Sequence, residues 1–135
     1  MDKKKQAIDF HHMGYNCAQS VVIPFCDDFG IDKETAFKLS EAFGFGMGTY
    51  GTCGTVSAMA IVLGMKNSNG NLGEGERSKG QTYKLIKEAT ERFLEKNSSI
   101  ICKDIKGMET GKILRSCDGC IEDAIDILEE MLAEL

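Results

Sequence analysis

The stretch GTVSAMAIVLGMK, residues 54–66, decides the fold of this chain. Its apolar side chains fall on nearly every side of a helix, whereas a surface helix keeps one solvated face. A helix of this kind is buried all round, so we expect it at the centre of the domain. It follows a glycine-rich run at residues 44–54, and the other helices are expected to pack around it.

The segments on either side also show helical spacing of apolar residues, and none alternates apolar and polar residues as a strand does. The first predicted helix spans residues 2–13, the second is capped by Asn16 and interrupted by Pro24, and the third is capped by Asp32. Two more are predicted at residues 76–96 and 117–135. The helix at 76–96 is expected to bury Tyr83, Ile86, Ala89, Thr90 and Phe93. The sequence therefore predicts an all-α fold. We expect one domain, residues 1–135, in which about five main helices form a compact bundle around residues 54–66.

Composition restricts the cellular compartment and the classes of binding partner that we expect for this chain. With 135 residues and 42% hydrophobic residues, the chain can bury a core without disulfides. The net charge of −5 argues against nucleic-acid and anionic-membrane partners. No apolar run approaches the ~18 residues of a membrane helix, and the N-terminus lacks a signal-peptide core, so we expect a cytoplasmic protein without membrane insertion. Cysteines in that compartment more often bind metal or do redox work than form permanent bridges.

Six cysteines are the candidate functional residues: Cys17, Cys26, Cys53, Cys102, Cys117 and Cys120. Three of them directly follow a residue that favours a helix start, namely Asn16, Thr52 and Ser116. A sulfur in the first turn of a helix feels the positive end of the helix dipole, which favours the thiolate. Cys53 is the strongest candidate, as the expected first residue of the central helix. Cys26 follows Pro24 and is expected to be a packing residue.

The CxxC unit at residues 117–120 has the spacing with which two sulfurs share a metal or close a small disulfide. A thioredoxin would need a βαβ pattern around it, and covalent haem would need a histidine where Ile121 stands. His11 and His12 are adjacent, so we expect them to point to different sides of their helix and not to ligate a metal.

The glycine-rich run is not a nucleotide-binding loop, because no strand precedes it and it lacks the P-loop lysine. Its glycines are expected to let the backbone approach another helix or adopt positive φ. Gly48, Gly51 and Gly54 are also candidate backbone donors to a sulfur site.

The order of the cysteines resembles the C_GCAxxG_C_C family of redox-active proteins. The resemblance rests on NCAQSV (residues 16–21), GMG (46–48), CGTVSA (53–58) and the two later cysteines, and it covers almost the whole chain. Thr55 stands where the family usually has alanine, and Ala58 where it has glycine. By position, the resemblance assigns the four family cysteines as Cys17, Cys53, Cys102 and Cys117, and leaves Cys26 and Cys120 outside the pattern. The family also looks related to the split-Soret cytochrome domain, but the haem-attachment sequence is missing here.

Two functional hypotheses follow. In the first, the four family cysteines converge near helix starts in an oxidoreductase or electron-transfer protein with an unidentified redox partner. They would either cycle between thiol and disulfide, with Cys53 attacking and another family cysteine resolving, or bind an iron–sulfur cluster or a metal ion, with Cys120 a less favoured ligand. In the second, the chain is a non-enzymatic binding or regulatory module whose cysteines hold structural zinc or are merely buried. The amphipathic last helix is compatible with a homodimer.

Overall fold

Helix α4 (Gly54–Asn67) lies in the middle of the molecule and contacts helices from both halves of the chain. The computed structural model describes residues 2–135, which form an all-helical bundle as predicted. The other elements are α1 (Lys3–His12), α2 (Cys17–Cys26), η1 (Asp27–Phe29), α3 (Lys33–Ser40), η2 (Glu41–Phe43), η3 (Gly46–Tyr50), α5 (Lys79–Asn97), α6 (Cys102–Ile105) and α7 (Cys117–Glu134).

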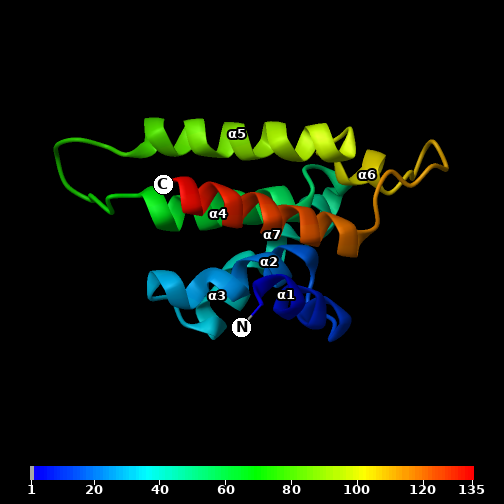
Figure 1. Cartoon of the computed structure of the whole chain (residues 1–135), viewed down its shortest axis with the longest axis horizontal. Helices are drawn as coiled ribbons and strands as arrows, with labels where there is room; N and C mark the ends of the chain where they lie inside the picture. Colours follow the sequence, from blue (N-terminus) through cyan, green and yellow to red (C-terminus); the bar gives the residue numbers. More distant parts are fainter. Residues whose placement is uncertain (1) are drawn as a thin grey trace.

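The helices are stacked in layers (Figure 1). Helix α5 lies on one side and contacts α4 and α7, which in turn contact α2. Helices α1 and α3 cover the far side of α2, and α1 also reaches α7. The early and late parts of the chain therefore meet at the α1–α7 contact, where the candidate site is built.

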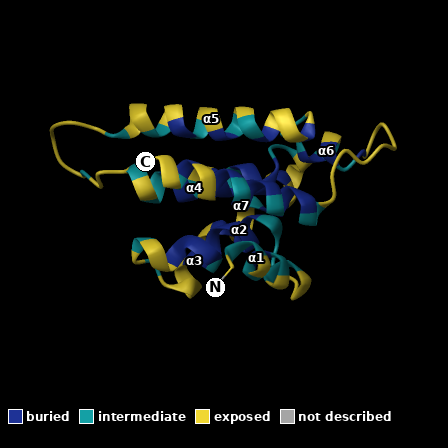
Figure 2. Cartoon of the chain, in the orientation of Figure 1, coloured by how far each residue is buried: buried dark blue, intermediate teal, exposed yellow. Residues whose placement is uncertain are grey.

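Helix α2 is the most completely buried helix. Every residue from Ala18 to Cys26 is buried, because α1, α3, α4 and α7 surround this helix (Figure 2). Helix α4 is central, but Ala60 on one edge is exposed, so burial on all sides describes α2 better than α4. Pro24 lies inside α2, and the α-helix ends at Cys26, where the tight turn η1 follows.

Three predicted helix starts are confirmed. Asn16 forms a complete capping box with Gln19, in which the Asn16 side chain accepts from the Gln19 backbone N–H at 2.9 Å. Asp32 caps α3 by accepting from Thr35, and Ser116 caps α7 by accepting from Gly119 at 3.0 Å.

Two local predictions are wrong. Thr52 does not cap the central helix: its backbone forms an isolated antiparallel bridge with Ile101, and Cys53 itself occupies the capping position. Helix α5 begins at Lys79 and leaves the Tyr83 side chain 64% exposed, because α5 packs mainly on α4 and α7. Within residues 2–135, no helix combines the length and the apolar character needed to cross a membrane.

A cavity lined by five cysteines

Five of the six cysteines line one cavity of about 340 Å³. We call Cys17, Cys53, Cys102, Cys117 and Cys120 the cavity cysteines. The four family cysteines each stand at the beginning of a different helix: Cys17 opens α2, Cys53 caps α4, Cys102 opens α6 and Cys117 opens α7. Four helix N-termini therefore face a common space, and all six thiols of the chain are free. Cys26 is buried at the end of α2.

Backbone hydrogen bonds hold two of these helix starts side by side. The Cys53 N–H donates to the Ile100 carbonyl at 2.7 Å, and the Cys102 N–H donates to the Gly51 carbonyl at 2.6 Å. These bonds flank the bridge between Thr52 and Ile101. A short two-stranded contact thus fixes Cys53 and Cys102, which are far apart in sequence, on one wall of the cavity.

The surroundings of Cys53 favour the thiolate. Hydrogen bonding from the Cys120 thiol lowers the pKa of Cys53 to about 6, against the opposing effect of burial. The Thr55 hydroxyl, 3.1 Å from the Cys53 sulfur, and the backbone N–H groups of Thr55 and Val56 also donate to it. The Cys53 sulfur at the start of α4 therefore accepts from both side-chain donors and amides of the first helical turn.

The surroundings of three other cavity cysteines favour the thiol. Hydrogen bonding to Cys53, followed by burial, raises the pKa of Cys120. Burial raises the pKa of Cys17 to about 12, and negative charge on Cys53 and Cys117 adds to the effect. Burial also raises the pKa of Cys102, again with a contribution from Cys53. The sulfurs are near enough to influence one another, so a charge on one disfavours a charge on the next.

The glycine-rich run forms part of the cavity wall without forming a phosphate loop. Its backbone donor to Cys17 is the Phe45 N–H, whereas the Gly51 N–H donates to the Gly46 carbonyl at 3.1 Å. Gly54 faces the cavity, and a Cβ atom there would lie 2.5 Å from the Cys17 sulfur. The close approach expected of a glycine is found at this position. Donation to sulfur by Gly48 and Gly54 stays a prediction.

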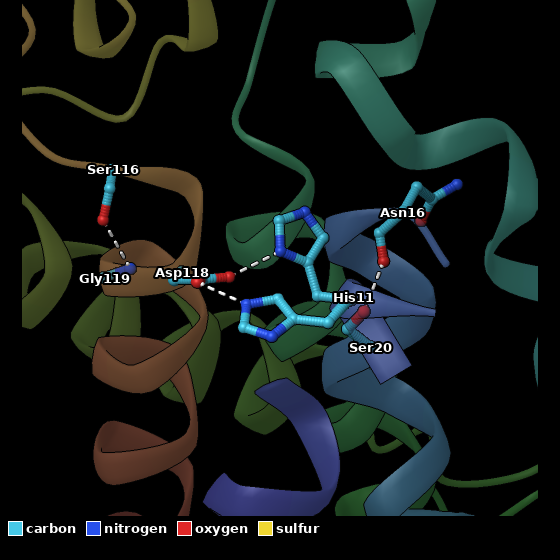
Figure 3. Close-up of polar contacts among 7 residues, drawn as sticks. His11, Asn16, Ser20, Ser116, Asp118 and Gly119 are labelled. Atoms are coloured by element: carbon cyan, nitrogen blue, oxygen red, sulfur yellow. Dashed lines mark hydrogen bonds and ion pairs between the residues drawn. The ribbon is translucent and has the colours of Figure 1, made fainter. Parts of the chain in front are cut away.

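Polar side chains border the cavity at the α1–α7 contact. His11 Nδ1 lies 2.6 Å from Asp118 Oδ1, and His12 Nε2 lies 2.8 Å from Asp118 Oδ2. Figure 3 shows His11 and Asp118 facing each other, next to the Ser116 cap of α7. The bonds from His12 and His11 lower the pKa of Asp118. The expectation that the two histidines point to different sides of α1 is therefore wrong, since both reach one carboxylate.

Sequence reasoning missed two features of this site. It set Cys120 aside as lying outside the family pattern, although its spacing of three from Cys117 puts both on one helical face. It also gave no partner to His11 and His12, because Asp118 is more than 100 positions away in the chain. The first feature had a local signal in the sequence, and the second had none.

The fold and the cavity define an all-helical protein whose distinctive feature is a cluster of cysteines at helix starts. The family model described as "Putative redox-active protein (C_GCAxxG_C_C)" matches residues 15–131. The chain belongs to this family, and the matched range contains all five cavity cysteines. Neither the curated proteins nor the solved structures contain a match to the chain.

Proposed function

We propose that this protein carries out thiol–disulfide exchange in the cysteine cavity, with Cys53 as the attacking sulfur and Cys120 as its resolving partner. The observation that supports this proposal most directly is that both sulfurs line one cavity with three further cysteines, where hydrogen bonding from Cys120 lowers the pKa of Cys53. Membership of a family described as redox-active agrees with it.

Cys53 has the properties of an attacking thiolate. Its lowered pKa favours the thiolate, and its donors include amides of the helix start. A thiol must be ionised to attack a disulfide, and a thiolate with a pKa somewhat below the ambient pH combines ionisation with nucleophilicity. Lys106 also lines the cavity and provides positive charge for an incoming anionic disulfide, whereas the charge of the neighbouring Arg115 is paired with Asp123.

The exchange needs a disulfide substrate and proceeds in two steps. The Cys53 thiolate attacks one substrate sulfur, which forms a mixed disulfide and releases the other substrate sulfur as a thiolate. Cys120 then loses its proton to solvent or to that thiolate and attacks the Cys53 sulfur. The products are a Cys53–Cys120 disulfide and a second substrate thiol, so the substrate is reduced and the protein is oxidised. A dithiol reductant returns the protein to its starting state.

The coupling between the two sulfurs sets the order of these steps. The pKa of Cys120 is raised chiefly by its hydrogen bond to Cys53 and by burial, with a further contribution from the Cys53 charge. The first step removes the negative charge on Cys53 by turning that sulfur into part of a disulfide. The hydrogen bond to the Cys53 thiolate and the Cys53 charge, which both raise the pKa of Cys120, then disappear. Cys120 therefore ionises more easily only after the mixed disulfide has formed. Cys17, Cys102 and Cys117 remain candidates for further exchange.

The spacing of the cavity cysteines does not favour a preformed structural zinc site. Zinc bound by four sulfurs at about 2.3 Å needs those sulfurs to be about 3.8 Å apart. Among residues 2–135, the group of three or more potential ligands whose atoms all lie within 4.8 Å of one another is His11, His12 and Asp118, not a set of cysteines.

The test is reduction of a small-molecule disulfide by the pre-reduced protein, followed by mass-spectrometric mapping of the bonds formed. Cys53→Ser should abolish the reaction, and Cys120→Ser should stop it at the mixed disulfide on Cys53. Cys26→Ser is the matched control, because Cys26 is equally buried but lies at the end of α2. An unchanged rate in Cys53→Ser would refute the proposal. Iron and sulfide in anaerobically purified protein would indicate a cluster instead.

A further inference from the structure

Two neighbouring histidines at the end of α1 and one aspartate in the first turn of α7 meet at the edge of the cysteine cavity. Consecutive residues of a helix point about 100° apart, yet both imidazoles reach the same carboxylate. Each carboxylate oxygen faces one ring nitrogen, at 2.6 Å and 2.8 Å. A simple ion pair between the helices would need only one of these histidines.

We propose that His11, His12 and Asp118 form a binding site for a divalent transition-metal ion of the zinc type. The three ligand atoms all lie within 4.8 Å of one another. Two imidazole nitrogens and one carboxylate oxygen are a ligand set that zinc and iron(II) accept in sites with an open position. The ion would replace the two hydrogen bonds, and its remaining position would hold water.

Binding requires a modest rearrangement of the cluster. Ligands at about 2.0–2.1 Å from a tetrahedral zinc ion lie about 3.3 Å apart, so a nitrogen now 2.6 or 2.8 Å from its carboxylate oxygen must move outward by about 0.5–0.7 Å, and ligand atoms near the 4.8 Å limit must move closer. The His12 side chain is 62% exposed and that of Asp118 is 37% exposed, so an ion can enter from solvent. The histidines occupy the last turn of α1, where the negative end of the helix dipole stabilises a cation.

The position of the site links it to the cavity. His11 itself lines the cavity, and Asp118 lies between Cys117 and Cys120 in the chain. A bound ion would therefore fix the start of α7, which carries both of these cysteines, against the end of α1. This metal site is independent of the exchange chemistry, and either can fail alone.

The experiment is titration of the reduced full-length protein with Zn²⁺ by calorimetry and with Co²⁺ by absorbance. We expect the protein to bind an ion. The affinity of the protein for this ion should fall by about a hundredfold or more in Asp118→Asn and in His12→Gln, because loss of even an outer-shell partner costs about 10–100-fold in metal affinity. The matched control is Asp126→Asn, which removes the ion pair between Asp126 and Lys4 across the same two helices at the same 37% exposure. This control should bind as the parent does.

The Co²⁺ spectrum identifies the ligands. When the Co²⁺ spectrum of Asp118→Asn is subtracted from that of the parent, the difference spectrum should show ligand-field absorption without a thiolate-to-cobalt charge-transfer band. Circular dichroism and thermal unfolding check that the variants fold. The proposal is overturned if no ion binds, if Asp118→Asn binds as tightly as the parent, or if the lost signal is a thiolate band.

Discussion

Replacing Thr55 by valine should raise the pKa of Cys53 while preserving the shape of the site. Thr55 is fully buried, and its hydroxyl lies 3.1 Å from the Cys53 sulfur. A hydrogen bond to a charged group contributes about 1.5–3 kcal/mol, and one pKa unit corresponds to about 1.4 kcal/mol. Loss of this donor should therefore move the pKa of Cys53 from about 6 to about 7–8. The thiolate fraction at pH 7 would fall from about nine tenths to between about a half and a tenth.

The assay is the rate of Cys53 alkylation between pH 4 and pH 10, followed on the Cys53 peptide by mass spectrometry. Thr52→Val is the matched control, because the Thr52 backbone keeps its bridge to Ile101 in that variant. Cys120→Ala should raise the midpoint further than Thr55→Val, since Cys120 is the largest cause of the low pKa of Cys53. An identical midpoint in Thr55→Val and Thr52→Val would refute the hydrogen-bond explanation.

Three further predictions concern stability, measured as the free energy of unfolding in denaturant. Gly54→Ala should destabilise the fold by about 1–3 kcal/mol, because its Cβ would lie 2.5 Å from the Cys17 sulfur and 2.7 Å from the Phe43 carbonyl oxygen. Asn16→Ala should cost about 1–2 kcal/mol, since it removes the cap of α2 and a 2.8 Å bond to the Glu41 carbonyl; a loss below ~0.3 kcal/mol would contradict this. The pKa of Cys17 is raised from 9.0 to about 12, so the unfolded chain loses this proton first as the pH rises. Stability should then fall by about 1.4 kcal/mol per pH unit between these values, and Cys17→Ala should show a shallower slope than the parent.

Local chemistry made part of this fold predictable. Asn16, Asp32 and Ser116 begin their helices as expected, because a capping side chain bonds to amides only two or three residues away. Thr52 has the same capping preference but pairs with Ile101 instead. That pairing joins segments far apart in sequence, so tertiary contacts displaced the helix start by one residue.

The candidate site likewise combines features that local sequence predicts with features that depend on tertiary contacts. The expected convergence of the four family cysteines rested on three of them standing next to predicted helix starts, while Cys102 was included only through the family resemblance, and the structure lines one cavity with all four. The effect of Cys120 on the pKa of Cys53 depends on how α7 packs beside α4, and the cluster around Asp118 depends on how α1 meets α7. On α5, the buried stripe is narrower than the apolar pattern suggests, because this helix is covered mainly by α4 and α7.

The wide sequence span of the cavity has a consequence for biosynthesis. The cavity draws on residues from His11 to Cys120, so nearly the whole chain must leave the ribosome before its walls can close. Until then, the early cysteines are carried on an emerging chain without their later neighbours, in which Cys53 lacks Cys120 as a hydrogen-bond donor. The largest cause of the low pKa of Cys53 is therefore in place only when the last helix docks, and we expect Cys53 in fragments that end before α7 to have a higher pKa than in the full chain.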